Sequence, residues 1–200
     1  MVLMTSNETQ ERQRDRQETI LRVAARVFRV KGYDAATTRE IAQAAGLSKS
    51  GFYHHVPSKQ DLLFQIMDRY ITRFLESVRE TYSLELQPEQ KMRLIIKRHI
   101  AMLAEWLDEG RVTHESRRSL NPDQLASYLA KRDAYVKHFV NTIEDGIAAG
   151  QFRKCNVLLT SHTILDVLNG MLRWYSPPGP PTLEEINEHM MYLIVERILK

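Results

Sequence analysis

The sequence predicts an all-α fold, and three observations support that prediction. Apolar residues recur at three- and four-residue spacing along most of the 200-residue chain, as they do on the buried face of a helix. No segment shows the sustained alternation of apolar and polar residues that is typical of a β-strand. Glycine, proline and capping residues interrupt the helical pattern at intervals and divide it into separate helices. With 43% hydrophobic and 26% charged residues, the chain can build a sizeable core.

Residues 37–59, TTREIAQAAGLSKSGFYHHVPSK, are predicted to form two short helices joined by a tight turn. Thr37 can cap the first helix, and Glu40, three positions later, can complete a capping box. Gly46 can adopt the left-handed conformation that turns the chain, because it has no Cβ. Ser48 can cap the second helix. The segment is therefore expected to be a helix-turn-helix.

The second helix of this pair is expected to have a polar outer face. Phe52 and Val56 are its apolar positions and should point inward. The outward positions are small, basic or able to form hydrogen bonds, namely Lys49, Ser50, Gly51, Tyr53 and His55. A helix that enters the major groove of DNA needs small side chains at its closest approach, donors for bases, and cations or hydroxyls for phosphates. The pattern therefore indicates a DNA-reading helix, and Lys59 would add a positive charge for the DNA backbone.

Residues 20–63 resemble the DNA-binding domain of the TetR family of one-component regulators. The resemblance rests on ILRVAARVFRVKGYDAATTREIAQAAG, on the Phe-Tyr-His-His box, and on the Ser-Lys-Gln-Asp-Leu-Leu opening of the fourth helix. It implies backbone or base contacts from Thr37, Thr38 and Arg39, base reading by Lys49, Ser50 and Gly51, and phosphate contacts from Tyr53, His55 and Lys59. The chain departs from the family at Gly51, where many members carry a threonine or serine that contacts DNA. Gly51 can offer only its backbone to the DNA.

After Lys59 the apolar period continues along one long helix. Pro88 predicts the first turn of the next helix, which is expected to reach about Leu107 and to be broken by Gly110. A polar segment over residues 111–120 should follow.

Three more helices are expected toward the end of the chain. They span residues 122–149 after an Asn-Pro pair, residues 156–175, and residues 182–200, where Thr182 and Glu185 can form a capping box after a proline-rich loop. The sequence therefore predicts a three-helix helix-turn-helix DNA-binding domain over residues 1–60. A long helix should join it to a helical ligand-binding and dimerisation domain over residues 61–200.

The last two predicted helices carry more apolar residues than one buried face requires. Their apolar residues lie on more than one face and include Leu158, Leu159, Ile164, Leu165, Leu168, Met171, Leu172 and Trp174 in one helix, and Ile186, Met190, Met191, Tyr192, Leu193, Ile194 and Ile198 in the other. Burial against a second copy would explain the surplus, and the TetR resemblance also implies a four-helix dimer interface. A homodimer would place two reading helices about one helical turn or more apart on a near-palindromic operator.

A ligand pocket is expected within residues 67–171. Its candidate lining residues are Ile96, Ile100, Leu103, Trp106, Tyr128, Tyr135 and Phe139, although the same spacing suits an ordinary helical core. The segments IEDGIAAGQFR and LRWYSPPGPPTLEEI resemble TetR regulators of lipid, fatty-acid or steroid breakdown, several of which are released by acyl-CoA thioesters. Two basic clusters could receive the phosphates of such a ligand or could be solvated helix faces: Arg111, Arg117 and Arg118, or Arg93, Lys97 and Arg98.

Positive charge is concentrated at the helix-turn-helix end of the chain. Residues 1–65 hold 10 Lys and Arg against 7 Asp and Glu, whereas residues 66–200 hold 18 of each kind. An excess confined to this end favours DNA binding through counterion release. Arg12, Arg14 and Arg16 could act as a DNA-binding arm or form a solvated helix start with the acidic residues between them.

These features predict a homodimeric repressor that binds a palindromic operator and is released by a small-molecule effector, with an acyl-CoA as the candidate. An activator and a DNA-binding protein without an effector are the alternatives. An enzyme is not predicted, because no phosphate loop or nucleophile motif occurs and Glu185 with His189 supplies only two metal ligands. No cofactor or metal is expected, and Cys155 has no disulfide partner. Without a signal peptide or a long apolar run, the chain is expected in the cytoplasm.

Overall fold

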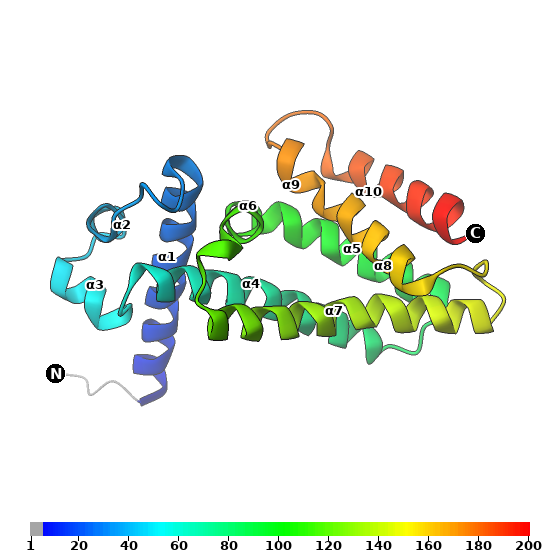
Figure 1. Cartoon of the computed structure of the whole chain (residues 1–200), viewed down its shortest axis with the longest axis horizontal. Helices are drawn as coiled ribbons and strands as arrows, with labels where there is room; N and C mark the ends of the chain where they lie inside the picture. The colour runs from blue at the N-terminus through cyan, green and yellow to red at the C-terminus, as the bar shows by residue number, and fades with distance from the viewer. Residues whose placement is uncertain (1–5) are drawn as a thin grey trace. The chain divides into compact units, whose positions relative to one another are not determined.

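The computed structural model describes residues 6–200, and every regular element among them is a helix (Figure 1). This confirms the all-α prediction. Side chains are described from residue 16 onward, with the exception of Lys49 and His54. The side chains of Arg12 and Arg14, for which a DNA-binding arm was considered, therefore lie outside the described residues, while Arg16 is exposed.

The chain divides into two compact units. The N-terminal unit comprises residues up to 69 together with residues 108–125, and the C-terminal unit comprises residues 70–107 and 126–200. Helix α4 (Lys59–Tyr82) belongs to both, because the division falls within it. The boundary expected after residue 60 divides the chain differently, since residues 61–69 and 108–125 group with the helix-turn-helix. The division into domains at residue 60 therefore stays a prediction.

The N-terminal unit is built around three helices and the first part of α4. These are α1 (Ser6–Lys31), α2 (Thr38–Ala44) and α3 (Lys49–His55). Their buried apolar side chains form one core that includes Ile20, Ala24, Phe28, Ile41, Phe52, Val56, Leu62, Leu63 and Ile66. The capping box at Thr37 is present, and Gly46 has a φ of 66°, so both local predictions are confirmed.

The helix break predicted at Gly110 is wrong, although the preceding helix ends close to Leu107 as expected. The fifth helix, α5 (Pro88–Glu105), ends at Trp106, where φ is −113° and ψ is 42°, and not at Gly110. Gly110 lies buried inside the next helix, α6 (Leu107–Ser116), which is followed by the short helix η1 (Arg117–Ser119). A glycine lowers the stability of a helix by about 1 kcal/mol relative to alanine but does not end it when its position is buried. The polar segment expected over residues 111–120 is therefore largely helical.

The C-terminal unit contains the remaining helices. They are the second part of α4, α5, α7 (Pro122–Ala148) from residue 126 onward, α8 (Val157–Asn169), α9 (Met171–Trp174), α10 (Leu183–Met191) and the final π-helix η2 (Tyr192–Leu199). The capping box of Thr182 and Glu185 begins α10, as the sequence predicted, and Asn156 caps α8. The helix expected over residues 156–175 is interrupted at Gly170.

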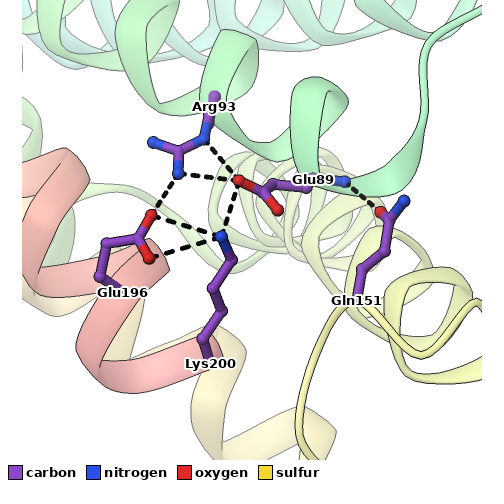
Figure 2. Close-up of polar contacts among 5 residues, drawn as sticks. All are labelled: Glu89, Arg93, Gln151, Glu196 and Lys200. Atoms are coloured by element: carbon purple, nitrogen blue, oxygen red, sulfur yellow. Dashed lines mark hydrogen bonds and ion pairs between the residues drawn. The ribbon is translucent and has the colours of Figure 1, made fainter.

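Charged side chains join the end of the chain to the first turn of α5 (Figure 2). Arg93 Nε donates to the carboxylate of Glu89 at 2.9 Å, and the same guanidinium binds Glu196. Lys200 donates to Glu89 at 3.1 Å and pairs with Glu196 at 3.4 Å. The hydrogen bond from Arg93 is the main reason that the pKa of Glu89 is lowered, despite some desolvation, and Lys200 adds to the effect. These residues fasten η2 to α5.

Gly146 lies where helix α7 meets the ring of Phe152, which is buried. We expect Gly146→Ala to lower the free energy of unfolding by about 1–3 kcal/mol, because the added Cβ would overlap the Phe152 ring. This loss should outweigh the better helix propensity of alanine. Urea unfolding followed by circular dichroism measures the change. In a Phe152→Leu background the same substitution should lower the free energy of unfolding by less. Equal decreases in both backgrounds would contradict the contact between Gly146 and the Phe152 ring.

Candidate DNA interface and effector region

Helix α3 has one buried side and one exposed side. Phe52 and Val56 are fully buried, while Ser50 is exposed and Tyr53 is 43% exposed. The Ser48 hydroxyl accepts a hydrogen bond from the amide of Gly51 at 3.1 Å and so caps the helix. The outward face predicted for this helix is therefore present at Ser50 and Tyr53.

Gly51 belongs to the first turn of α3, close to the cap. A Cβ at this position would lie 3.2 Å from the Ser48 hydroxyl oxygen, which is tighter than an ordinary contact. Glycine therefore leaves room for the capping hydroxyl, and it is half-buried. His55, at the end of α3, is also half-buried, and the side chain of Lys49 lies outside the described residues.

The start of α2 is held by its own side chains and by α3. The carboxylate of Glu40 accepts hydrogen bonds from the backbone and hydroxyl of Thr37 and a 2.5 Å bond from Lys31. Lys31 and then the Thr37 bonds lower the pKa of Glu40 to about 2. The Thr38 hydroxyl lies 3.0 Å from the Tyr53 hydroxyl, so two predicted DNA contacts join α2 to α3. Arg39 is exposed beside them.

The ammonium group of Lys59 is bound by the protein itself. It donates to the carbonyl oxygens of Tyr33 at 2.9 Å, Asp34 at 3.2 Å and Ala36 at 3.1 Å. It also lies 4.5 Å from the centre of the Tyr33 ring. An ammonium has three N–H donors, so none is left for a phosphate while these bonds hold. The side chain therefore binds the segment between α1 and α2, and the phosphate contact that the sequence predicts for it stays a prediction.

The candidate effector region lies in the C-terminal unit. All seven predicted pocket residues are buried, namely Ile96, Ile100, Leu103, Trp106, Tyr128, Tyr135 and Phe139. Tyr135 and Phe139 belong to a cluster of aromatic rings that also includes Phe74 and His99. The Tyr135 hydroxyl lies 2.9 Å from Nδ1 of His99. The region is therefore an aromatic core with a polar pair inside it.

His99 is a residue of this region that the sequence predictions missed. It is 2% exposed, and burial lowers its pKa to about 4 against a smaller opposing effect of the Asn169 side chain. The imidazole is therefore neutral at pH 7. The signal was available, because His99 follows Ile96 by three residues and precedes Leu103 by four, on the same buried helical face.

In the basic cluster of Arg93, Lys97 and Arg98, the two arginines bind other parts of the protein, while Lys97 is exposed. Arg93 is bound by Glu89 and Glu196, and Arg98 donates to the Ser77 carbonyl and the Thr81 hydroxyl, both at 2.9 Å. Internal partners therefore occupy both guanidinium groups of this cluster. In the other cluster, Arg117 and Arg118 are exposed on η1 and Arg111 is half-buried.

No helix in the described part of the chain is both long and apolar enough to cross a membrane. Among the same residues, no three side chains of the metal-binding types come together. Glu185, which was weighed as a metal ligand, accepts hydrogen bonds from the backbone and hydroxyl of Thr182 at 2.7 and 2.9 Å. Its carboxylate serves as a helix cap.

A capped helix-turn-helix with a polar outer face defines a class of DNA-binding regulators. Residues 20–66 match the family model described as bacterial regulatory proteins, tetR family. Residues 85–198 match the model of the tetracyclin repressor-like C-terminal domain. The chain therefore belongs to the TetR family, whose members are transcriptional regulators and not enzymes.

Similar proteins cover nearly the whole chain. The transcriptional repressor KstR2 of Mycobacterium tuberculosis is 25% identical over 194 residues, which is 92% of this chain and 94% of KstR2. The crystal structure of the TetR family regulator PfmR from Thermus thermophilus has a TM-score of 0.84 at 29% identity and covers 90% of this chain and 99% of PfmR. The crystal structure of AibR in complex with isovaleryl coenzyme A and operator DNA has a TM-score of 0.82 at 25% identity and covers 90% of this chain and 98% of AibR.

We expect His99 to make the folded protein less stable as the pH falls from 7 to 5. Its folded pKa of about 4 lies below the ordinary value of 6.5, so in this window the unfolded chain binds a proton that the folded chain does not. The free energy of unfolding should fall by about 2 kcal/mol between pH 7 and pH 5. Urea unfolding at the two pH values should show a smaller loss in His99→Gln, which keeps a polar partner for Tyr135. Equal losses in both proteins would contradict the buried neutral imidazole.

Proposed function

We propose that the protein is a homodimeric repressor that binds a near-palindromic operator and is released by a small molecule, in the cytoplasm where its DNA is. The observation that carries the proposal is the exposed face of α3, held by burial of Phe52 and Val56 and by the Ser48 cap. Family membership supports DNA binding, and the similar protein KstR2 is named a repressor. An activator with the same interface is the alternative, as is a DNA-binding protein without an effector.

The proposed DNA contacts come from α2 and α3. They are Thr37, Thr38 and Arg39 for the backbone or a base, Lys49, Ser50 and Gly51 for bases, and Tyr53 and His55 for phosphates. The exposure of Arg39, Ser50 and Tyr53 supports this assignment. The hydrogen bond between Thr38 and Tyr53 would keep the two helices in register as they approach the DNA.

A second copy of the chain would cover apolar side chains that are exposed on the C-terminal unit. Leu158 is 57% exposed, Leu159 is 63% exposed, Trp174 is 47% exposed and Tyr192 is 51% exposed. Leu158 also lines a groove of about 500 Å³ between α7 and α8, together with Val136. These helices are the ones whose surplus of apolar residues predicts a dimer interface, and large exposed apolar patches are typical of such interfaces.

The proposed effector is an acyl-CoA thioester. AibR, which is similar along nearly its whole length, was crystallised with isovaleryl coenzyme A and operator DNA. The aromatic core around Tyr135 and Phe139 would suit an acyl chain, and the pair of His99 and Tyr135 offers polar atoms within it. Because all the candidate lining residues are buried, binding requires this core to open.

Release from DNA would follow from linkage between the two binding events. An effector that favours the arrangement unable to bind DNA weakens DNA binding by the same free energy with which DNA weakens effector binding. A coupling of about 1–3 kcal/mol per subunit corresponds to roughly 5- to 150-fold in affinity. Helix α4 is the proposed carrier, because it begins directly after the helix-turn-helix and continues to Tyr70 and Phe74, which pack beside the aromatic cluster.

The proposal is tested by a gel shift of the purified protein with DNA from upstream of its own gene. The assay is run at two salt concentrations, with and without acyl-CoAs of several chain lengths and with free coenzyme A as the control. We expect a sequence-specific complex that one class of acyl-CoA dissociates and free coenzyme A does not. A specific complex that no acyl-CoA affects would remove the effector assignment and leave the DNA-binding assignment in place.

We expect glutamates at Leu158 and Leu159 to make the protein monomeric, because charged groups would be buried in the dimer interface. Operator affinity should fall by roughly 100-fold or more, since the second half-site contact is lost. Light scattering after size-exclusion chromatography measures the mass, and circular dichroism checks the fold. Leu84→Glu, at a leucine that is 43% exposed outside the late helices, is the matched control and should stay dimeric. A dimeric double variant would refute this interface.

A further inference from the structure

We propose that Lys59 is a positioning residue for DNA recognition, which fixes the segment between α1 and α2 instead of binding a phosphate. The proposal rests on the DNA-binding function argued above and gives Lys59 a different part in it. Three backbone carbonyls converge on the Lys59 ammonium at 2.9, 3.2 and 3.1 Å. We call the contact of Lys59 with Tyr33, Asp34 and Ala36 the lysine clamp.

The clamp supplies hydrogen-bond donors to a segment of irregular backbone. Helix α1 ends at Lys31, just before Gly32 with its φ of 80°, and α2 begins only at Thr38, so the carbonyls between the helices accept no helical hydrogen bonds. Three carbonyl oxygens that point at one place repel each other unless a donor lies between them. The three N–H bonds of an ammonium supply one donor for each oxygen.

Both ends of the clamp are anchored in the unit. At one end, Lys59 opens α4, where the Ser58 hydroxyl accepts a 3.0 Å hydrogen bond from the Asp61 amide. At the other end, the Tyr33 ring lies 4.5 Å from the ammonium and 5.2 Å from the ring of Phe28, which is buried in the core. The clamp therefore joins the first turn of α4 to the end of α1.

The clamped segment leads directly into the proposed DNA contacts. Ala36 is followed by Thr37, the cap of α2, and Thr38 is hydrogen-bonded to Tyr53 on α3. A shift of the segment would therefore move the start of α2 and, with it, the face of α3. Base reading depends on the position of the reading helix much more than general attraction to phosphates does. Loss of the clamp should harm specific binding more than nonspecific binding.

Two substitutions distinguish the clamp from a phosphate contact. Lys59→Met keeps the aliphatic length and removes the charge and the donors. Lys59→Arg keeps the charge, but a planar guanidinium cannot direct three N–H bonds at carbonyls arranged around one point. A phosphate contact would survive Lys59→Arg, whereas the clamp would not.

The experiment measures dissociation constants of the full-length protein for operator and random DNA at several salt concentrations. For Lys59→Met we expect operator binding to weaken about tenfold or more, random binding to change less than about threefold, and the salt slope to stay within about 0.3 of wild type. Lys59→Arg should not restore operator binding. Arg39→Gln, at an exposed proposed phosphate or base contact, is the control and should lower the slope by about one if it binds phosphate.

A second measurement tests the clamp on the free protein. The Ala36 amide donates to the Gly32 carbonyl at 3.2 Å, and its hydrogen exchange should be at least about tenfold faster in Lys59→Met because the segment opens more often. A salt slope lowered by about one, with rescue by Lys59→Arg, would overturn the proposal in favour of a phosphate contact. Unchanged exchange at Ala36 would also overturn it, even if no specific operator is found and the repressor function itself fails.

Discussion

Burial of Phe52 and Val56 is the constraint on which the candidate DNA interface depends. A helix of seven residues, such as α3, is too short to be stable in water by itself, so its orientation comes from packing and capping. Once two apolar side chains fix its inner side, the position of every other residue follows from the helical period. Ser50 and Tyr53 face solvent for that reason. The chemistry of the interface is thus set by two side chains that would never touch DNA.

The parts of the structure that the sequence predicted correctly are those governed by local interactions. A capping box depends on side chains three residues apart, so Thr37 and Thr182 could be recognised without a fold. Gly110 was misread because local propensity favours a break there, whereas burial in α6 decides the outcome. The carbonyls that bind Lys59 come from residues more than twenty positions away, and no sequence pattern reports where a carbonyl points.

The aromatic core of the C-terminal unit contains a buried polar pair, His99 and Tyr135, which a fully apolar core would not need. Burying an imidazole without a partner costs free energy, and the bond between His99 and Tyr135 offsets part of that cost. Phenylalanine at both positions would pack without any polar group, so the pair favours a role beyond filling space. A core that admits the proposed effector must combine tight packing with the ability to open. The buried polar pair is where an incoming polar group would find new partners.

The internal partners of the cations also change how the basic charge of the N-terminal end should be understood. Residues 1–65 carry an excess of three positively charged residues over acidic ones. Arg29, however, pairs at 2.6 Å with Asp108, which the count leaves out, whereas the pair of Lys31 and Glu40 is already balanced within it and Lys59 keeps its charge on neutral carbonyls. Asp108 lies outside the counted segment but inside the same compact unit, so the charge available to DNA is smaller than the count. The salt dependence of DNA affinity therefore depends on the cations that are able to contact phosphates. The exposed faces of α2 and α3 are where such contacts are proposed.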